Sequence, residues 1–384
     1  MPTSELQVPA LTRVPLNDLA AASREVEPAL DRLWADLKKT SGFVGGRCVE
    51  QFEQEWAQYC GTRMAVGVAS GTDAIELSLR AMGIGPGCEV IVPANTFIAT
   101  AEAVLLAGAT PRFADVGADT LLLRAQDAEA VMSHRTAAVI AVHLYGAMPD
   151  MGQLGDFCAK HGLALIEDAA QAHGATWSGR RAGSFGRVGC FSFYPGKNLG
   201  AFGDAGAVVT DDEILADRVR RLANHGRPPG ASHIHSLVAR NSRLDALQAG
   251  VLSAKLQFLD EWNARRRDLV NSYRSDLVSF GVRMITVDSR CRAVFHQNVV
   301  RLDHRDDVKR LLECQGIATG IHYPIPCHLQ EPYRHYASER LPVVELAANT
   351  VLSLPVFPHM TIEQVRRVSA ALRQALEELG GRVD

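Results

Sequence analysis

The chain has 384 residues, of which 47% are hydrophobic and 22% are charged, and its formal net charge is −3. This is the composition of a globular protein long enough for two domains, and its near-neutral charge gives no electrostatic reason to expect nucleic acid as a partner. Because no apolar run approaches ~18–20 residues and the N-terminus lacks a signal-peptide pattern, we expect no membrane partner.

Short apolar runs alternate with helical patterns from about residue 62 to 210. Several of these runs are nearly continuous Val, Ile, Ala and Leu, as expected of strands covered on both faces. The predicted strands are 64–69, 89–93, 110–115, 137–143, 163–168, 189–193 and 206–210, and the helices between them include 73–82, 98–106, 151–160 and 211–223. This alternation predicts an α/β domain with a mostly parallel or mixed sheet.

The pattern changes near residue 260. Long helical segments at 244–258 and 260–277 precede a strand-like run at 296–301, a helix at 305–315 and a final helix that starts at Thr361 with a capping-box pattern. We therefore predict a large α/β domain with an N-terminal arm over residues 1–260, and a smaller α/β domain over residues 261–384.

The eight cysteines include no C-x-x-C pair. This spacing argues against a zinc ribbon or a thioredoxin-like motif, and the length of the chain argues against a disulfide scaffold. We expect reduced thiols in a cytoplasmic enzyme without a metal centre.

Two stretches of the large domain suit ligand binding. Ser70-Gly71-Thr72 lies where a strand leads into a helix, so its backbone N–H groups favour an anion such as phosphate, although an ordinary helix cap is the alternative. Glu167 and Asp168 end a buried strand, where ligands bind in α/β sheets. The alternative for these carboxylates is that one of them caps the next turn.

Lys197 lies among aromatic residues and glycines in FSFYPGKNLGAFGD. The phosphate-loop pattern is absent, because Asn198 follows the lysine and the glycine spacing is wrong. An apolar pocket would lower the pKa of Lys197 and favour the neutral amine used in covalent chemistry, whereas a solvated turn would not. An anion-binding turn, an acid at a strand end and a reactive lysine together are the set that pyridoxal 5′-phosphate requires.

The chain resembles the pyridoxal-phosphate-dependent nucleotide-sugar aminotransferases of the DegT/StrS family. The resemblance is carried, in the family's order and over nearly the whole chain, by SGTDAIELSLRAMGIGPGCEVIVPANTFIATAEAV, VHLYGAMPDM, IEDAAQAHGA, GSFGRVGCFSFYPGKNLGAFGDAGAVVT, NSRLDALQAGVL, IHYPIPCHLQEPY and LPVVELAANTVLSLPVFP. It implies the aspartate-aminotransferase-like fold (fold type I), with a large mixed-sheet α/β domain and a smaller C-terminal α/β domain.

The resemblance also implies which residues hold the cofactor. Lys197 would bind it covalently and move the proton during the reaction, Asp168 would pair with the pyridinium nitrogen, and Gln171 would donate a hydrogen bond to the phenolic oxygen. Phe97 would stack on the ring.

The phosphate would be bound by Gly71, Thr72 and Ser192, joined by Asn241 of the partner subunit. The resemblance therefore implies a homodimer with shared active sites. Ala205 departs from the commoner GDGGA pattern of the family, and we expect its methyl group to be tolerated unless the backbone there has a positive φ.

The resemblance implies an amino transfer from L-glutamate to a nucleotide-linked ketosugar, in the biosynthesis of deoxyaminosugars for antibiotics or polysaccharides. Relatives that remove a sugar hydroxyl carry His in place of the lysine, so Lys197 favours transamination over dehydration. Tyr194, His322 and Tyr323 are expected on the substrate side, although His322 as a structural histidine and Tyr194 as packing under the lysine turn are alternatives.

The stretches HLYGAMPDM and FSFYPGKNLGA favour a dTDP-linked 3-keto-6-deoxyhexose, aminated at C3. Three alternatives stay open: a C4 aminotransferase acting on dTDP-4-keto-6-deoxyglucose, another pyridoxal-phosphate reaction, and a non-catalytic sugar-nucleotide sensor with the same fold.

Overall fold

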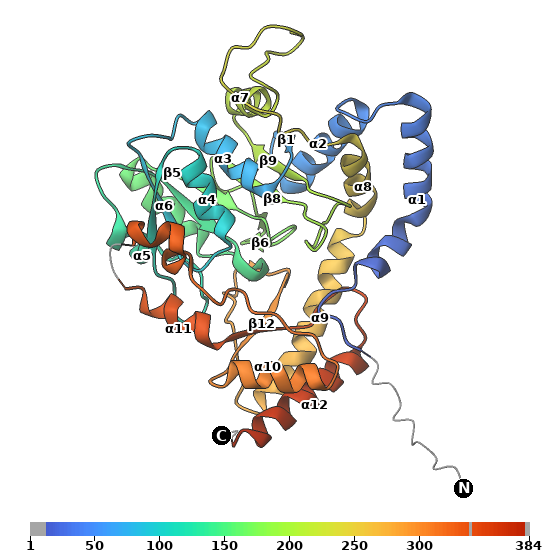
Figure 1. Ribbon diagram of the computed structural model, residues 1–384, viewed down its shortest axis with the longest axis vertical. Helices are drawn as coiled ribbons and strands as arrows, with labels where there is room; N and C mark the ends of the chain where they lie inside the picture. Colours follow the sequence, from blue (N-terminus) through green and yellow to red (C-terminus); the bar gives the residue numbers. More distant parts are fainter. Residues whose placement is uncertain (1–12, 338–339, 381–384) are drawn as a thin grey trace.

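A large seven-stranded sheet forms the centre of the protein (Figure 1). The structure is a computed structural model that describes residues 13–337 and 340–380. The strands are β1 (Met64–Val68), β2 (Glu89–Pro93), β3 (Thr110–Ala114), β4 (Thr136–Val142), β5 (Ala164–Asp168), β8 (Val188–Ser192) and β9 (Gly206–Thr210). Their spatial order is β1-β9-β8-β5-β4-β2-β3, and only β9 runs antiparallel to its neighbours. This confirms the predicted mixed, mostly parallel sheet.

Helices pack around the sheet. They are α1 (Leu19–Thr40), α2 (Arg47–Cys60), α3 (Gly71–Ala81), α4 (Ile98–Leu106), α5 (Ala125–Val131), α6 (Met151–His161), α7 (Glu213–Ala223) and α8 (Ala246–Leu256). Of these, α1 lies outside α8 and not against the sheet itself (Figure 1). The predicted strands and helices of this region are confirmed, with ends that differ by at most two residues. The N-terminal arm was predicted without its two helices, α1 and α2.

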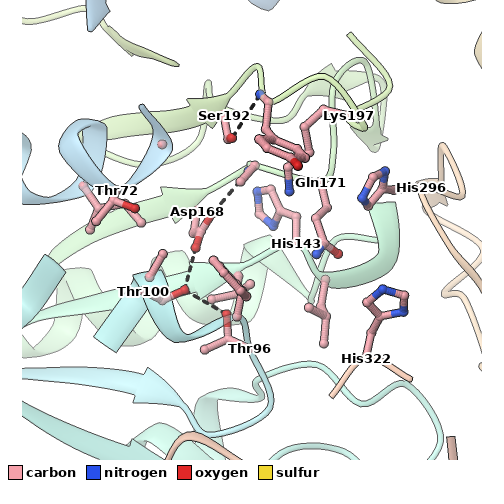
Figure 2. Close-up of a pocket in the computed structure, with 18 of the residues that line it drawn as sticks. Thr72, Thr96, Thr100, His143, Asp168, Gln171, Ser192, Lys197, His296 and His322 are labelled. Atoms are coloured by element: carbon pink, nitrogen blue, oxygen red, sulfur yellow. Dashed lines mark hydrogen bonds between the residues drawn. The ribbon is translucent and has the colours of Figure 1, made fainter. Parts of the chain in front are cut away.

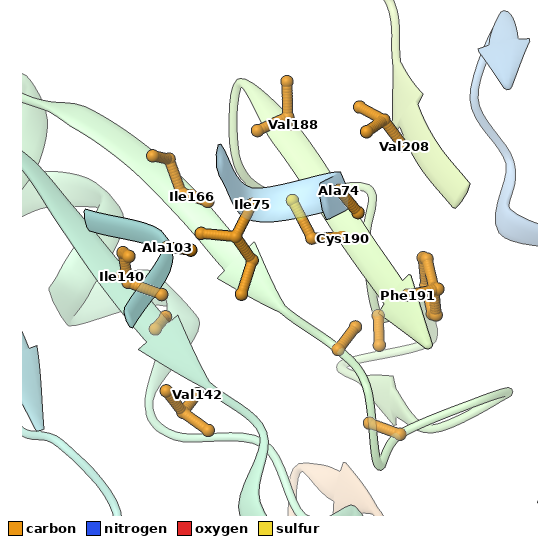
Figure 3. Close-up of a cluster of buried hydrophobic side chains, with 14 of the residues drawn as sticks. Ala74, Ile75, Ala103, Ile140, Val142, Ile166, Val188, Cys190, Phe191 and Val208 are labelled. Atoms are coloured by element: carbon orange, nitrogen blue, oxygen red, sulfur yellow. The ribbon is translucent and has the colours of Figure 1, made fainter. Parts of the chain in front are cut away.

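Buried apolar side chains cover both faces of the sheet. Figure 3 shows this core, in which Ile140, Ile166 and Val188 from three adjacent strands pack with Ile75 of α3. These four side chains are at most 2% exposed, and full burial of one such side chain contributes about 1.5–3 kcal/mol. The packing fixes the carboxyl ends of β4, β5 and β8 relative to the start of α3.

The rest of the chain contains a smaller lobe with its own sheet. The lobe includes α9 (Leu259–Val278), β10 (Arg283–Met284), β12 (Asn298–Arg301), α10 (Arg305–Cys314), β13 (Val351–Leu354) and α12 (Ile362–Glu378), and the sheet order is β10-β12-β13. The capping box at Thr361 and Gln364 is confirmed, since each side chain accepts the other residue's backbone N–H. Val365, Val368 and Leu372 are buried in the core of this lobe.

Short elements link the lobe to the large sheet. β11 (Cys291–Arg292) pairs with β6 (Thr176–Trp177), which pairs with β7 (Arg180–Arg181). The 3-10 turns η1 (Leu144–Gly146), η2 (Cys327–Leu329) and η3 (Glu331–Tyr336) complete the described elements together with α11 (Pro342–Thr350). Cys327, Tyr333 and Val344 join the core of the large sheet although they lie beyond residue 260. The division of the chain at that residue stays a prediction.

All eight cysteines are free thiols. No helix among the described residues is both long enough and apolar enough to cross a bilayer.

Candidate active site

A cavity of about 440 Å³ lies where β4, β5 and β8 end and where α3 and α4 begin. Small-molecule sites of this size are common at the carboxyl ends of strands. Ten of the predicted site residues line the cavity: Gly71, Thr72, Phe97, Asp168, Gln171, Ser192, Tyr194, Lys197, His322 and Tyr323. Figure 2 labels six of them: Thr72, Asp168, Gln171, Ser192, Lys197 and His322. Asn241 lies outside it with an exposed side chain, and its backbone forms an isolated bridge with Asn224.

Asp168 is the last residue of β5 and its carboxylate faces the cavity. The side chain is 6% exposed, and its Oδ2 accepts a hydrogen bond of 2.7 Å from Thr100 Oγ1. Thr96 in turn donates to Thr100 Oγ1 at 2.8 Å, while the Ala170 N–H donates to Asp168 Oδ1 at 3.2 Å. Each carboxylate oxygen keeps a free lone pair, so Asp168 can accept a further hydrogen bond from a ligand.

Glu167 faces the other way, since successive side chains of a strand point to opposite faces. Its Oε1 accepts backbone N–H bonds from Phe185 at 2.6 Å and Gly186 at 2.7 Å, and its Oε2 accepts one from Gly183 at 2.7 Å. Glu167 therefore fixes the distant 183–186 turn, whereas Asp168 accepts the Ala170 N–H in the turn directly after β5 and also keeps lone pairs for a ligand.

His143 follows β4 and connects Glu167 to the cavity. Its Nε2 lies 2.8 Å from Glu167 Oε2, so the carboxylate holds the tautomer that carries a proton on Nε2. The ring lines the cavity, and its buried Nδ1 has no hydrogen-bond partner among the described residues. His143 was not predicted as a site residue, although it ends a predicted strand just as Asp168 does.

Lys197 sits in the turn after β8, with its backbone N–H donating to Tyr194 O at 2.8 Å. Burial lowers the pKa of its amine from 10.5 to about 8, although the negative charge of Asp168 opposes that shift. About a tenth of the amine is then neutral at pH 7, against far less for an ordinary lysine. Of the two alternatives weighed for Lys197, the structure shows the buried pocket and not the solvated turn.

The Ser70-Gly71-Thr72 turn is both a helix cap and a lining of the cavity. Ser70 is the N-cap of α3, and its Oγ accepts the Asp73 N–H at 3.1 Å. A Cβ on Gly71 would lie 2.6 Å from Ser192 Cβ, so glycine is required for the close approach of β8. This approach brings Ser192 beside the first turn of α3, where backbone N–H groups have no partner within the helix.

Gln171 and Tyr323 link the two sides of the cavity. Gln171 Nε2 donates to the Tyr323 hydroxyl at 3.1 Å, and its Oε1 accepts the Tyr145 N–H at 2.7 Å. The ring of Phe97, 53% exposed, lies 5.7 Å from that of Tyr323 between centroids. One N–H of the Gln171 amide stays available to a ligand.

Two histidines lie on the same side of the cavity as Tyr323. His322 Nδ1 is 2.8 Å from Ser353 Oγ, and burial together with the positive charge of Lys197 lowers its pKa to about 4. His296 Nδ1 is 3.1 Å from Asn198 Oδ1, and burial, followed by Lys197, holds its pKa well below the ordinary value. Both rings are therefore uncharged at neutral pH. His296 was not predicted as a site residue, because it was assigned to the start of the predicted strand at 296–301.

Ala205 causes no backbone conflict. It is absent from the described residues with a positive φ, and its carbonyl accepts the Phe193 N–H at 2.7 Å. The expectation that a methyl group is tolerated at this position is confirmed.

Comparisons with known proteins agree with this geometry. The sequence model of the DegT/DnrJ/EryC1/StrS aminotransferase family matches residues 28–373. The chain is 44% identical over 368 residues to the UDP-N-acetyl-3-dehydro-alpha-D-glucosamine 3-aminotransferase of Acidithiobacillus ferrooxidans, covering 95% of this chain and 98% of that one. It is also 44% identical over 370 residues to the dTDP-3-amino-3,4,6-trideoxy-alpha-D-glucose transaminase of Streptomyces venezuelae, covering 96% and 97%.

A solved structure shows the same fold. The crystal structure of NtdA from Bacillus subtilis with bound cofactor PMP superposes with a TM-score of 0.90 at 30% identity, covering 96% of this chain and 86% of that one.

Proposed function

Because the chain belongs to the DegT/DnrJ/EryC1/StrS aminotransferase family, we propose that it uses pyridoxal 5′-phosphate at Lys197 to transfer an amino group to a nucleotide-linked ketosugar. One observation carries this proposal: a lysine with a pKa of about 8 shares a cavity with a buried carboxylate and an anion-binding turn. The cytoplasmic location expected from the sequence stays a prediction.

The described residues fit this cofactor. The amine of Lys197, the free lone pairs of Asp168 and the N–H groups at the start of α3 supply a covalent anchor, an anion for a protonated ring nitrogen and a phosphate site. His143 Nδ1 adds a buried ring nitrogen without a partner, which a polar ligand in the cavity would satisfy. When bound, pyridoxal phosphate supplies a conjugated ring that accepts the electron pair of the bond broken at the amino-bearing carbon.

Lys197 Nζ is the general base and acid of the proposed reaction. Its lowered pKa places part of the amine in the neutral form at pH 7, so that it can remove a proton from the substrate carbon and return it. Asp168, oriented by Thr100 and the Ala170 N–H, would hold the ring nitrogen in its protonated form.

Other side chains would orient the ring and the phosphate. We assign the available N–H of Gln171 to the phenolic oxygen and the ring of Phe97 to stacking. Gly71, Thr72 and Ser192 would bind the phosphate. Each of these residues lines the cavity.

Asn241 would complete the phosphate site from a second copy of the chain. Its exposed side chain lies outside the cavity of its own subunit, which is what a residue that serves the partner's site requires. Phe97 and Tyr194, 53% and 59% exposed, border the same cavity and would be covered in a homodimer.

We propose C3 of a hexose as the position of amination and L-glutamate as the amino donor. The names of both 44%-identical relatives place the amino group at C3, one on a dTDP sugar and the other on a UDP sugar. A dTDP-linked 3-keto-6-deoxyhexose is the preferred acceptor, and Tyr194, His322 and Tyr323 would contact it.

A product assay tests this function. The protein with pyridoxal 5′-phosphate and glutamate is offered dTDP-linked 3-keto and 4-keto hexoses and the corresponding UDP sugars, and the products are identified by mass spectrometry. We expect 2-oxoglutarate and a 3-amino sugar nucleotide from the wild-type protein, and neither from Lys197→Ala. Glutamate consumption without any amino sugar would contradict the proposal, and a 4-amino product would reassign the position.

A further inference from the structure

The helix that begins at the proposed phosphate site carries two carboxylates close to that site. Asp73 is the third residue of α3, and its Oδ2 accepts a hydrogen bond of 3.1 Å from Ser70 Oγ. Ser70 lines the cavity together with Gly71 and Thr72. Glu76 follows one turn later on the same helix and is 2% exposed. If Asp73 and Glu76 had no cationic partners, their negative charges would oppose the binding of a doubly charged phosphate at the start of α3.

Arg240 lies against both carboxylates. Its Nη2 forms ion pairs with Asp73 Oδ1 and with Glu76 Oε2, the latter at 2.5 Å. Arg80 holds the other oxygen of Glu76, with Nη1 3.3 Å from Oε1. Two carboxylates are thus matched by two guanidinium groups. Arg240 does not line the cavity, so its influence on a ligand there acts through its partners.

We propose that Arg240 is a positioning residue for cofactor binding, because it cancels the charge of Asp73 and Glu76 and keeps the start of α3 attractive to phosphate. The inference rests on the proposed function, in which Gly71, Thr72 and Ser192 bind the phosphate of pyridoxal 5′-phosphate. It assigns an electrostatic task to a residue outside the site.

A merely structural role makes different predictions. The backbone N–H of Arg240, which Arg240→Met would keep, donates to Leu222 O at 3.3 Å, and the Arg80 guanidinium donates to Val238 O at 2.7 Å, so hydrogen bonds besides the ion pairs tie the segment after α7 to its neighbours. A structural role for the Arg240 side chain would be to position this segment and the adjacent Asn241. In that case the harm would persist after Asp73 and Glu76 are neutralised, whereas an electrostatic effect would disappear.

The test compares ligands with and without a phosphate group. Protein stripped of cofactor is titrated with pyridoxal 5′-phosphate and with pyridoxal, and binding is followed by absorbance and tryptophan fluorescence. In Arg240→Met we expect affinity for pyridoxal 5′-phosphate to fall by about 10- to 100-fold, because two carboxylates lose their counter-charge near a dianion. Affinity for pyridoxal should change by less than about threefold.

Three further variants complete the test. Arg240→Lys should retain most of the affinity, because it keeps the charge. Combining Arg240→Met with Asp73→Asn and Glu76→Gln should restore binding to within about threefold of wild type. The variant with Asp73→Asn and Glu76→Gln alone should bind pyridoxal 5′-phosphate more tightly than wild type, because Arg240 is then uncompensated.

The outcomes separate this inference from the proposed function. Equal losses for both ligands, no recovery in the combined variant, or no gain in the variant that keeps Arg240 would overturn the role of Arg240. If Arg240→Met does not fold, the variant with Asp73→Asn and Glu76→Gln decides alone. A wild-type protein that binds no pyridoxal 5′-phosphate would contradict the proposed function itself.

Discussion

The two sides of the cavity differ in how their residues are held. The cofactor wall, which we define as Gly71, Thr72, Asp168, Ser192 and Lys197, is built at the ends of β5 and β8, the start of α3 and the turn after β8. The substrate wall, which we define as Tyr194, His296, His322 and Tyr323, lies wholly on connecting segments, and its Tyr194 shares the turn after β8 with Lys197.

Burial separates only the extremes of the two walls, because the other residues of both are half-buried. Asp168 is 6% exposed and anchored by two hydrogen bonds, whereas Tyr194 is 59% exposed. Sites that serve a fixed chemistry benefit from rigid supports, while connecting segments vary without disturbing the sheet. We therefore expect changes in the cofactor wall to abolish the reaction, and changes in the substrate wall to alter which sugar is used.

The largest effect is expected at Asp168. Asp168→Asn removes the charge that would hold the ring nitrogen protonated, so we expect kcat to fall by about 10²- to 10³-fold with little change in KM. Steady-state assays with glutamate and the sugar nucleotide measure both constants. Wild-type activity in this variant would contradict the expectation that changes in the cofactor wall abolish the reaction.

Glu167→Gln is the matched change on the opposite face of β5. Its amide would set an N–H against backbone donors of the 183–186 turn, which we expect to cost about 2–4 kcal/mol of the free energy of unfolding. Urea unfolding measures this loss for both variants. Asp168→Asn should lose less stability, and the reverse order would contradict the roles assigned to the two carboxylates.

The pH dependence of cofactor capture is the next effect in size. Only the neutral amine of Lys197 reacts, and its folded pKa is lowered to about 8, so the rate should rise about tenfold per pH unit below that value and level off above it. Stopped-flow absorbance after mixing with pyridoxal 5′-phosphate measures the profile. A rate that keeps rising beyond pH 10 would mean that the amine has an ordinary pKa.

Thr100→Val removes one hydrogen bond to Asp168 and keeps the shape of the side chain. We expect a loss of about tenfold in kcat, since a hydrogen bond to a charged group contributes about 1.5–3 kcal/mol. Thr96→Val is the control, because Thr96 donates to Thr100 and not to Asp168. Equal losses in both variants would show that orientation of Asp168 is not the cause.

The smallest effect is expected in the substrate wall. His322→Gln should raise KM for the sugar nucleotide by about 3- to 10-fold and leave KM for glutamate unchanged, because one polar contact contributes about 1 kcal/mol. Its neutral imidazole, with a pKa of about 4, should add no step to the pH profile near neutrality. A large fall in kcat would contradict the assignment of His322 to the substrate wall.

The difference between the two walls also explains which site residues could be predicted from local sequence patterns. Asp168 and Ser70-Gly71-Thr72 were found from strand and helix patterns, because the ends of regular elements converge at one edge of a parallel sheet. The apolar runs likewise predicted all seven strands of the large sheet. Tyr194, His322 and Tyr323 were proposed only through the family resemblance.

Long-range contacts account for what was missed. His296 approaches the cavity because Asn198, 98 residues earlier, fixes its ring. Arg240 forms ion pairs with Asp73 and Glu76 of α3, and it lies 167 residues from Asp73 in the sequence. The local sequence pattern does not predict such pairs. Sequence patterns within one element do not contain such pairings, which depend on how distant segments pack.

The most direct test of the central claim is the location of the covalent bond to the cofactor. Lys197 and Lys255 both have pKa values lowered to about 8 by burial, but Lys255 donates to Gly200 O at 2.7 Å and lies outside the cavity. The wild-type protein is incubated with pyridoxal 5′-phosphate, reduced with borohydride and mapped by peptide mass spectrometry. The account predicts a single label on Lys197 that persists in Lys255→Met, and a label on Lys255 or on no lysine would contradict it.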